Sequence, residues 1–367
     1  MSLLFITQHY YPSKGGMAES CDRLIRNFRK SGVAVHIIHF TNRRKKFHTE
    51  AAVHGSYSAV PVNNSEEFTL NLASQFIEGL PILKDVKYVV AFGGYLPLSL
   101  GPILSKYIAK PLITFIRGND FDEAIFSKRR EMLLYALKNS EFIFTVTKEK
   151  RDKIKKLTAH SKVYFTPNGV DTKLWKPAIS QLPQVEALKE SSAGKKRIVI
   201  VGQLKAKKGI LEFSKTFANF SYKDAYEIWL IGDVEDSVKN HIETLPIQVQ
   251  FFSFVNKNEL IAYYHAADIV LIPSFYDGMP NVLLEAGASK NVIIASKIGG
   301  IQDVIEHQKD GFLFNPLKPA SLLEALTHVH RATAEKKEGI ANALFEKIEK
   351  EYTEEKEIRN YLKNLEL

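Results

Sequence analysis

Short apolar runs alternate with longer amphipathic stretches along the first half of the chain. The run Leu3 to Ile6 reads as a buried strand, the chain breaks at 11–16, and a helical pattern follows from Met17 to about Lys30. The same alternation predicts further strands at 35–40, 88–92, 112–116 and 142–146. Strands that alternate with helices are typical of a parallel, doubly wound α/β sheet. Residues 43 to about 67 show no clear period and are predicted to form an irregular loop region.

A second alternating series begins after the middle of the chain. Its strands are predicted at 197–202, 227–231, 249–252, 269–272 and 292–295. The segment 178–196 is rich in Ser, Gln, Pro and Glu, has no consistent period, and is interpreted as a linker. We therefore predict an N-terminal, acceptor-side Rossmann-like domain over 1–177, the linker 178–196, a C-terminal nucleotide-sugar-binding Rossmann-like domain over 197–345, and a helical tail over 346–367 that packs back on the first domain.

Length and composition agree with a soluble two-domain protein. The chain has 367 residues, of which 45% are hydrophobic and 25% charged. Its single cysteine, Cys21, excludes an intrachain disulfide, and no signal-like segment opens the sequence, so a cytoplasmic location is expected. The uncharged stretch 88–105 contains three Gly and two Pro residues, which favour a strand, a loop and a short helix over a membrane span.

The net charge of +9 is unevenly distributed. Residues 1–177 hold 27 Lys and Arg against 15 Asp and Glu, a net charge of +12, whereas the rest of the chain carries −3. Clusters such as 43–46 and 128–130 favour an anionic partner for the first domain, either a membrane surface or a phosphorylated acceptor. An ordinary solvated surface is the alternative. Nucleic acid is disfavoured because no nucleic-acid module accompanies the clusters.

The strongest chemical signal is a pair of carboxylates, Asp277 and Glu285, around a Gly-Met-Pro-Asn turn. An uncharged run over 269–273 precedes the turn, and Pro280 suits the first turn of a following helix. The N-terminus of a helix attracts anions through its backbone N–H groups and its dipole. This junction therefore predicts an anion site, with a phosphate as the obvious candidate.

A second strand-to-helix loop carries small residues and lysines over 202–209. Lysines at the carboxyl end of a parallel strand can neutralise phosphate oxygens. Taken alone, the loop is better explained as an ordinary strand-to-helix turn with surface lysines, and only its company with the other motifs favours a phosphate site.

Five elements occur in an order that resembles the family-four retaining glycosyltransferases, also described as glycosyl transferases group 1. These elements are Gly15-Gly16, Arg117-Gly118-Asn119-Asp120, Pro167-Asn168-Gly169-Val170-Asp171, the loop 202–209, and the pair Asp277 and Glu285. The resemblance spans nearly all of the chain and implies the GT-B fold: two facing Rossmann-like domains with parallel sheets and an interdomain cleft.

The resemblance also implies an activity. Such enzymes move a sugar from a nucleotide diphosphate sugar to a hydroxyl acceptor with retention at the anomeric carbon. We expect a UDP-sugar as the leading donor and a lipid-linked or cell-surface glycan precursor as acceptor, with no metal or other cofactor required. The protein would act in the cytoplasm or on the inner face of the cytoplasmic membrane.

By resemblance, Glu285 binds the ribose hydroxyls, Asp277 holds sugar hydroxyls, and Lys208 offsets charge on the departing diphosphate. The implied catalytic residues are Asp277, Lys208, Arg117 and Asp120. The implied donor-binding residues are Gly15, Gly16, Gln203, Lys208, Asp277, Gly278, Met279, Pro280, Asn281, Val282 and Glu285.

Three positions depart from the commonest family pattern. Gln203 replaces an arginine, Asp277 is one methylene shorter than the usual glutamate, and Arg117 stands where many members carry a histidine. A structural salt bridge is the alternative role for Arg117. A structural turn is the alternative for Asn168 and Asp171.

Other classes of protein fit less well. A dehydrogenase is disfavoured because neither strand-to-helix loop has the Gly-x-Gly-x-x-Gly fingerprint. The triplet Asp120-Phe121-Asp122 resembles a metal-binding motif of another glycosyltransferase fold, and we interpret it as a coincidence. A nucleotide-sugar epimerase of the same fold and a non-catalytic nucleotide-sugar-binding module remain as alternatives.

Overall fold

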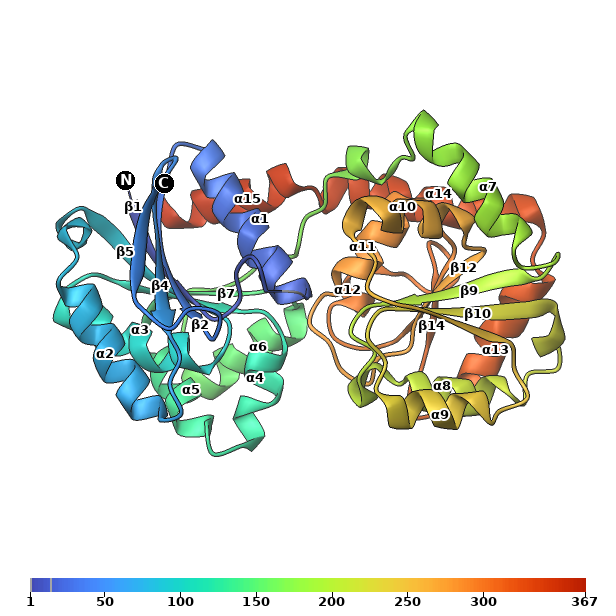
Figure 1. Ribbon diagram of the computed structural model, residues 1–367, viewed down its shortest axis with the longest axis horizontal. Coiled ribbons are helices and arrows are strands. Elements are labelled where there is room, and N and C mark those ends of the chain that lie inside the picture. The colour runs from blue at the N-terminus through green and yellow to red at the C-terminus, as the bar shows by residue number, and fades with distance from the viewer. Residues whose placement is uncertain (1, 14) are drawn as a thin grey trace. The chain divides into compact units, whose positions relative to one another are not determined.

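The computed structural model describes residues 2–13 and 15–367, and its chain forms two compact units (Figure 1). One unit comprises Met1–Asn168 together with Glu354–Leu367, and the other comprises Gly169–Thr353. The division after Asn168 lies before the predicted boundary at 177. The tail segment that belongs to the first unit begins at Glu354 rather than at 346.

The first unit is built on an eight-stranded sheet in the order β3-β4-β2-β1-β5-β6-β7-β8. All neighbouring strands are parallel except β3 and β4, which are antiparallel. The strands are β1 (Ser2–Thr7), β2 (Ala34–Thr41), β3 (His48–Ala52), β4 (Gly55–Pro61), β5 (Val86–Phe92), β6 (Leu112–Ile116), β7 (Ser140–Thr145) and β8 (Val163–Phe165). The five strands predicted for this half are confirmed.

The prediction of an irregular region over 43–67 is wrong, because β3 and β4 form a hairpin there. Gly55 opens β4 with φ of +137°, and a Cβ at this position would lie 2.0 Å from the Val35 carbonyl oxygen. Glycine is therefore required where the hairpin meets β2. Strand β3 is mostly exposed and polar, so it lacks the apolar run by which the other strands are recognised.

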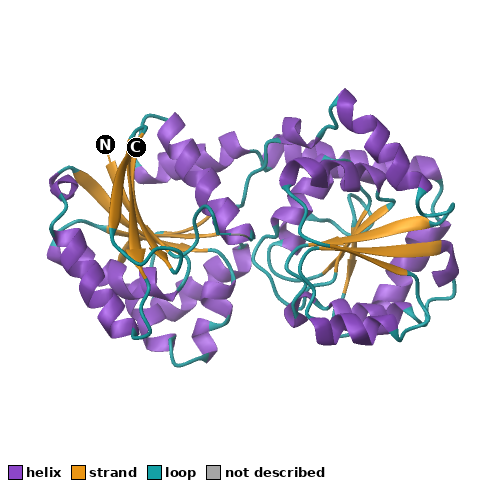
Figure 2. Cartoon of the chain, in the orientation of Figure 1, coloured by secondary structure: helices purple, strands orange, loops and turns teal. Residues whose placement is uncertain are grey.

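Helices cover both faces of this sheet (Figure 2). The helices are α1 (Gly16–Lys30), α2 (Glu66–Glu78), α3 (Tyr95–Tyr107), α4 (Asn119–Asp122), α5 (Arg130–Lys138), α6 (Lys148–Thr158) and α15 (Glu354–Leu365). Alternate residues of a strand point to opposite faces. Accordingly, Leu3 and Phe5 pack in one core cluster with residues of α1 and α15, whereas Leu4 and Ile6 pack in another with residues of α2, α3, α5 and α6.

The uncharged stretch 88–105 forms β5 and most of α3, as predicted. Within the described residues, every helix is too short or too polar to cross a bilayer.

The second unit contains a fully parallel six-stranded sheet in the order β11-β10-β9-β12-β13-β14. The strands are β9 (Lys196–Val201), β10 (Tyr226–Ile231), β11 (Val249–Phe252), β12 (Ile269–Ile272), β13 (Ile293–Ser296) and β14 (Phe312–Phe314). The five predicted strands are confirmed, and β14 is additional. Strand order reverses between β9 and β12, which is the point where open α/β sheets bind ligands.

The remaining helices are α7 (Leu182–Glu190), α8 (Ile210–Phe217), α9 (Asp236–Glu243), α10 (Lys257–Ala266), α11 (Asn281–Ala288), α12 (Ile301–Val304), α13 (Pro319–Arg331) and α14 (Ala334–Glu351). The segment interpreted as a linker contains α7, which packs against α10 and buries Val185. This segment is therefore a structured part of the second unit.

Candidate active site

Three loops meet at the carboxyl ends of the adjacent strands β9, β12 and β13. The Phe275 N–H donates to the Lys207 carbonyl at 2.9 Å, which joins the loops after β9 and β12. The Gly300 N–H donates to the Gly278 carbonyl at 2.8 Å, which joins the loops after β12 and β13. The two motifs with the strongest chemical signal in the sequence are thereby held together.

Two glycines allow this close approach of the loops. Gly209 has φ of +66°, and a Cβ there would lie 2.2 Å from the Pro273 carbonyl oxygen. Gly299 has φ of +40°, and a Cβ there would lie 2.2 Å from the Asp277 carbonyl oxygen. Any larger residue would push the loops apart.

Lys208 and Asp277 form an ion pair across these loops. The Lys208 Nζ lies 2.5 Å from the Asp277 Oδ2, and about a quarter of each side chain remains exposed to solvent. The pair therefore places a cation and an anion, both accessible to a ligand, at the reversal point of the sheet. Gln203 is exposed in the same loop.

Glu285 lies one turn inside α11, the helix that Pro280 caps. Its carboxylate is buried, with 6% of the residue exposed. The Tyr264 hydroxyl donates to Oε2 at 3.2 Å, and the Lys257 Nζ lies 3.8 Å from Oε1. The turn before the helix is packed: Gly278, Met279 and Pro280 are buried, while Asn281 and Val282 are half-buried.

Arg117 belongs to a buried polar network of the first unit. Its Nη1 donates to the Tyr361 hydroxyl at 3.1 Å, its Nη2 donates to the Asn168 Oδ1, and the same Nη2 lies 3.7 Å from the Glu357 Oε1. Arg23 donates to the same carboxylate through Nε at 2.8 Å. Burial raises the pKa of Tyr361 well above its ordinary value, although Arg117 opposes this shift. These contacts are those of an arginine in a structural salt bridge, the alternative role considered for Arg117 from the sequence.

Asp120 holds the backbone of the loop that carries Arg117. Its carboxylate accepts the N–H groups of Arg117 at 2.8 Å, Gly118 at 2.7 Å and Phe121 at 3.1 Å. Burial raises the pKa of this carboxyl group, while the N–H of Arg117 opposes the rise. Asp122 pairs instead with Lys150 at 2.9 Å. Both acids of the triplet are therefore engaged by neighbouring protein groups.

The glycine loop of the first unit leads into α1. Gly15, with φ of +110°, occupies the N-cap position and Gly16 begins the helix. Lys14, which precedes them in the predicted loop, lies outside the described residues. Asp171 accepts the Lys173 N–H at 3.0 Å, as expected of a residue that caps a turn.

Several contacts of these residues come from distant parts of the sequence. Tyr264 and Lys257 approach Glu285 from α10, and Glu357 and Tyr361 approach Arg117 from α15. These partners could not be found from the sequence, because no local spacing links Glu285 to a tyrosine 21 residues earlier, or Arg117 to a tyrosine 244 residues later.

Residues 185–344 match the model of the family described as glycosyl transferases group 1. The match lies within the second unit, and the chain is a glycosyltransferase whose residues 185–344 resemble this family. Among curated relatives, an uncharacterised glycosyltransferase of Methanocaldococcus jannaschii is 24% identical over 88% of this chain and 87% of its own length. The Escherichia coli UDP-Gal:alpha-D-GlcNAc-diphosphoundecaprenol alpha-1,3-galactosyltransferase is 28% identical over 46% of this chain and 45% of its own length.

Solved structures show the same fold. Sucrose-phosphate synthase from Thermosynechococcus elongatus superimposes with a TM-score of 0.84 at 16% identity, covering 99% of this chain and 97% of the other. HepE of Anabaena, crystallised with UDP and also with UDP-glucose, superimposes with TM-scores of 0.81, at 17% identity in the UDP complex, covering all of this chain. The glycosyltransferase has the two Rossmann-like domains of the GT-B class.

Proposed function

We propose that this glycosyltransferase moves a sugar, with retention of anomeric configuration, from a UDP-sugar to a hydroxyl group of a glycan precursor. The observation that carries the proposal is the junction in the second unit, where Lys208, Asp277 and Glu285 lie on loops joined by backbone hydrogen bonds. The crystallisation of HepE with UDP and UDP-glucose supports a nucleotide-sugar donor.

Each residue of the junction has a role that suits its chemistry. The buried Glu285 carboxylate accepts hydrogen bonds from the ribose hydroxyls, and Lys208 balances charge on the diphosphate as it leaves. The turn from Gly278 to Val282 presents the donor, and Asp277 accepts hydrogen bonds from the sugar hydroxyls. Because Lys208 contacts Asp277, the lysine also sets the position of the carboxylate that selects the sugar.

In the transfer step, the acceptor oxygen forms a bond to the anomeric carbon as the bond from that carbon to the phosphate oxygen breaks. Attack takes place on the face from which the diphosphate leaves, and a phosphate oxygen receives the hydroxyl proton. No metal ion is required in this scheme, because Lys208 offsets the charge that develops on the leaving group.

We assign Arg117 and Asp120 to positioning. Asp120 fixes the loop after β6, and Arg117 joins this loop to α15 through Tyr361 and Glu357. The first unit would supply the acceptor side, to which Gly15 and Gly16 contribute a backbone that can approach a ligand closely.

We further propose that the acceptor is lipid-linked and that the first unit docks on anionic membrane. The E. coli relative acts on a diphosphoundecaprenol-linked acceptor, as its name states. The net charge of +12 over residues 1–177 would attract an anionic surface. The exposed Phe126, 92% accessible, precedes the basic cluster 128–130 and offers an apolar group for the same surface. Liposome binding that ignores both lipid charge and salt would contradict this part.

Two substitutions test the donor site. Glu285→Ala and Lys208→Ala should each weaken nucleotide binding or slow transfer by about 10-fold or more, equivalent to about 1.4 kcal/mol. Matched controls are Glu212→Ala and Lys215→Ala, two residues of α8 that lie outside the junction. If both Glu285→Ala and Lys208→Ala bind nucleotide and transfer sugar as the parent protein does, the assignment of these residues to the donor site is refuted.

Product analysis separates the alternatives. Transfer to an acceptor supports the proposal. Conversion of the donor to its epimer without an acceptor would indicate an epimerase, and binding with no turnover of any donor would indicate a binding module. A thermal-shift screen of UDP-, GDP- and ADP-sugars identifies the base, since a ligand of the native state raises apparent stability.

A further inference from the structure

The Glu285 carboxylate has a lysine beside it to which the proposed transfer assigns no role. Lys257 is the first residue of α10, and its Nζ lies 3.8 Å from the Glu285 Oε1. Glu285 is buried, whereas about half of the Lys257 side chain is exposed to solvent. The second unit therefore places a buried anion and a surface cation next to each other.

The ammonium group is held in place without using its hydrogen-bond donors. It lies 5.2 Å from the centre of the Trp175 ring, an attractive cation–π arrangement. Trp175 is buried and packs edge-on against Tyr264, which donates to the other oxygen of Glu285 at 3.2 Å. Among residues 2–13 and 15–367, the Lys257 ammonium donates no hydrogen bond to a protein group. Its three N–H groups are therefore available to a ligand.

Lys257 occupies a position where a lysine is unfavourable for the helix itself. Asn256 caps α10, because its Oδ1 accepts the N–H groups of Asn258 and Glu259, both at 3.1 Å. The first turn of a helix is the positive end of its dipole, which favours acids and disfavours cations. Residues that break a local rule of this kind are expected at functional sites. Helix formation gives no reason for a lysine here, whereas a ligand at Glu285 does.

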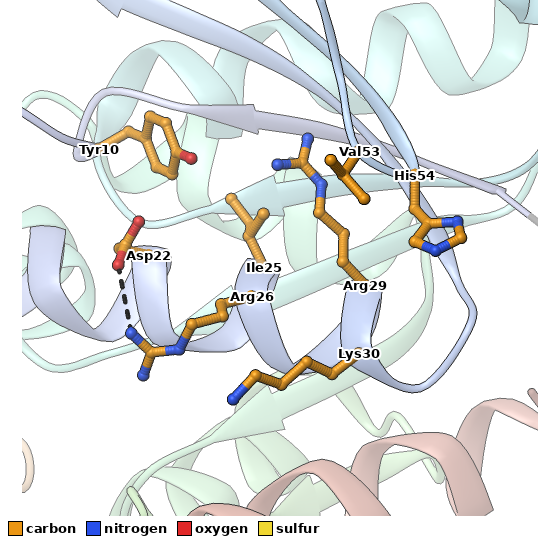
Figure 3. A pocket seen from close by; sticks show the side chains of 8 residues that line it. All are labelled: Tyr10, Asp22, Ile25, Arg26, Arg29, Lys30, Val53 and His54. Atoms are coloured by element: carbon orange, nitrogen blue, oxygen red, sulfur yellow. Dashed lines mark ion pairs between the residues drawn. The ribbon is translucent and has the colours of Figure 1, made fainter.

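Two opposite charges that face each other distinguish this site from a groove of the first unit beside α1 (Figure 3). In that groove, the Arg29 guanidinium and the Lys30 ammonium point in different directions, so they do not converge on one ligand group (Figure 3). Lys257 and Glu285, in contrast, lie within 3.8 Å of each other.

The gap between Lys257 and Glu285 suits a hydroxyl group. A separation of 3.8 Å is too long for a direct hydrogen bond, so neither charged group uses a hydrogen bond on the other. A hydroxyl both donates and accepts, so it can donate to the carboxylate and accept from the ammonium at the same time. Hydrogen bonds with one charged partner are the strong ones. A ligand hydroxyl at this point would therefore satisfy both groups.

We propose that Lys257 is a specificity-determining residue of the donor site, where it contacts the ribose hydroxyls of the nucleotide together with Glu285. One ribose hydroxyl donates to the carboxylate and accepts from the ammonium, which makes the site selective for ribose over deoxyribose. The inference rests on the proposed donor site, because it extends the ribose contact assigned to Glu285.

Calorimetric titration of the full chain with UDP and with 2′,3′-dideoxy-UDP tests the proposal. The parent should bind UDP more tightly, and the ratio of the two Kd values measures the contribution of the hydroxyls. Lys257→Met keeps an apolar stem over Trp175 and removes the charge. It should weaken UDP binding by about 10-fold or more, the usual effect of one charged hydrogen bond, and leave binding of the dideoxy analogue nearly unchanged.

Lys239→Met is the matched control. Lys239 is a half-exposed lysine of α9 whose Nζ lies 4.0 Å from the Glu243 Oε1 and 5.1 Å from the centre of the Phe251 ring. Its partner carboxylate is exposed rather than buried, and the residue belongs to none of the three loops of the junction. This variant should bind both nucleotides like the parent. Lys257→Arg retains the charge and the donors, so it should keep most of the preference for UDP.

Thermal melting without ligand separates a binding role from a structural one. Because the lysine opposes the helix dipole, Lys257→Met should melt at the parent temperature or above it, although it binds UDP more weakly. Equal weakening of UDP and of the dideoxy analogue would show that Lys257 only supports the fold, and would overturn the proposal.

Failure of the donor site itself would look different. Parent-like UDP binding by Glu285→Ala, or no binding of UDP, GDP or ADP by the parent, would refute the donor site and this inference with it. If GDP or ADP binds instead of UDP, its own dideoxy analogue is used, since the ribose is common to all three. If Glu285→Ala loses the preference for the hydroxyls while Lys257→Met keeps it, the donor site stands and the role of Lys257 is refuted.

Discussion

Two arginines of the first unit share one buried carboxylate. Arg23 and Arg117 both approach Glu357, and all three residues are at most 8% exposed. Buried charges are tolerated only when they are paired and hydrogen-bonded, so removal of the acid leaves two cations without compensation. The network also holds Asn168, the last residue of the first unit before the chain crosses to the second.

We predict that Glu357→Ala lowers the free energy of unfolding of the first unit by about 3–5 kcal/mol, the usual cost of breaking a buried ion pair. Glu355→Ala removes an exposed acid from the same helix and should change it by less than about 0.5 kcal/mol. Urea titration of both variants measures the difference. Similar stabilities would show that the network contributes little.

His39 gives the first unit a pH dependence. Burial lowers its pKa from 6.5 to about 4, and its Nδ1 lies 2.9 Å from the Tyr57 hydroxyl oxygen. The folded state therefore favours the neutral ring. The resulting stability is fully present above pH 6.5 and is lost as the pH falls toward 4, because the unfolded chain binds the proton first.

We expect His39→Gln to flatten the fall in unfolding free energy between about pH 7 and pH 5, as measured by urea titration at several pH values. His9 and His36, whose pKa values burial also lowers, would account for the slope that remains. His48→Gln, on the exposed strand β3, serves as the control and should keep the parent slope. If the unfolding free energy of His39→Gln falls with pH as steeply as that of the parent protein, groups other than His39 cause the pH dependence.

At the scale of elements, the proposed donor site depends on how closely the loops after β9 and β12 approach each other. Gly209 combines a positive φ with a backbone contact to Pro273. Gly194, in the turn before β9, has φ of +83°, but a Cβ at this position would have no other atom within 4 Å. Substitution of these two glycines therefore distinguishes the free-energy cost of the backbone conformation, present at both, from the cost of a steric clash, present only at Gly209.

Gly194→Ala should destabilise the second unit by about 1 kcal/mol, the conformational cost alone. Gly209→Ala should cost more than that and should also weaken UDP binding, because the methyl group displaces the loop that carries Asp277. Thermal melting and nucleotide titration of the two variants measure both effects. Equal losses would mean that the loops can separate without harm to the site.

The sequence predicts strands well where both faces of the strand are buried. Strands such as β1 and β12 are buried along their whole length and read as apolar runs. In the hairpin, β3 is mostly exposed and the first half of β4 is only half-buried, while the apolar runs of β8 and β14 are three residues long, so the sequence pattern does not predict these strands. The motifs proposed to bind the donor are contiguous in the sequence and could therefore be selected as candidates, whereas the partners of Arg117 on α15 depend on tertiary packing that leaves no local pattern.

At the scale of the whole molecule, each unit has its own hydrophobic core. Two clusters, on opposite faces of the first sheet, stabilise the first unit, and a separate cluster around β9 to β14 stabilises the second. The backbone passes between the units at 168–169 and again at 353–354. A ligand held entirely by one unit should therefore stabilise that unit's core first.

We predict that UDP protects the second unit selectively. At a concentration about 100-fold above its Kd, a ligand of the native state adds about 2.7 kcal/mol to apparent stability. Hydrogen exchange followed by mass spectrometry should show slower exchange in the loops after β9, β12 and β13 and in α11, with little change in β1 to β8. Glu285→Ala should abolish this protection. Protection centred on β1 to β8 or on α1 would instead place the nucleotide on the first unit and contradict the assignment of the donor site to the second.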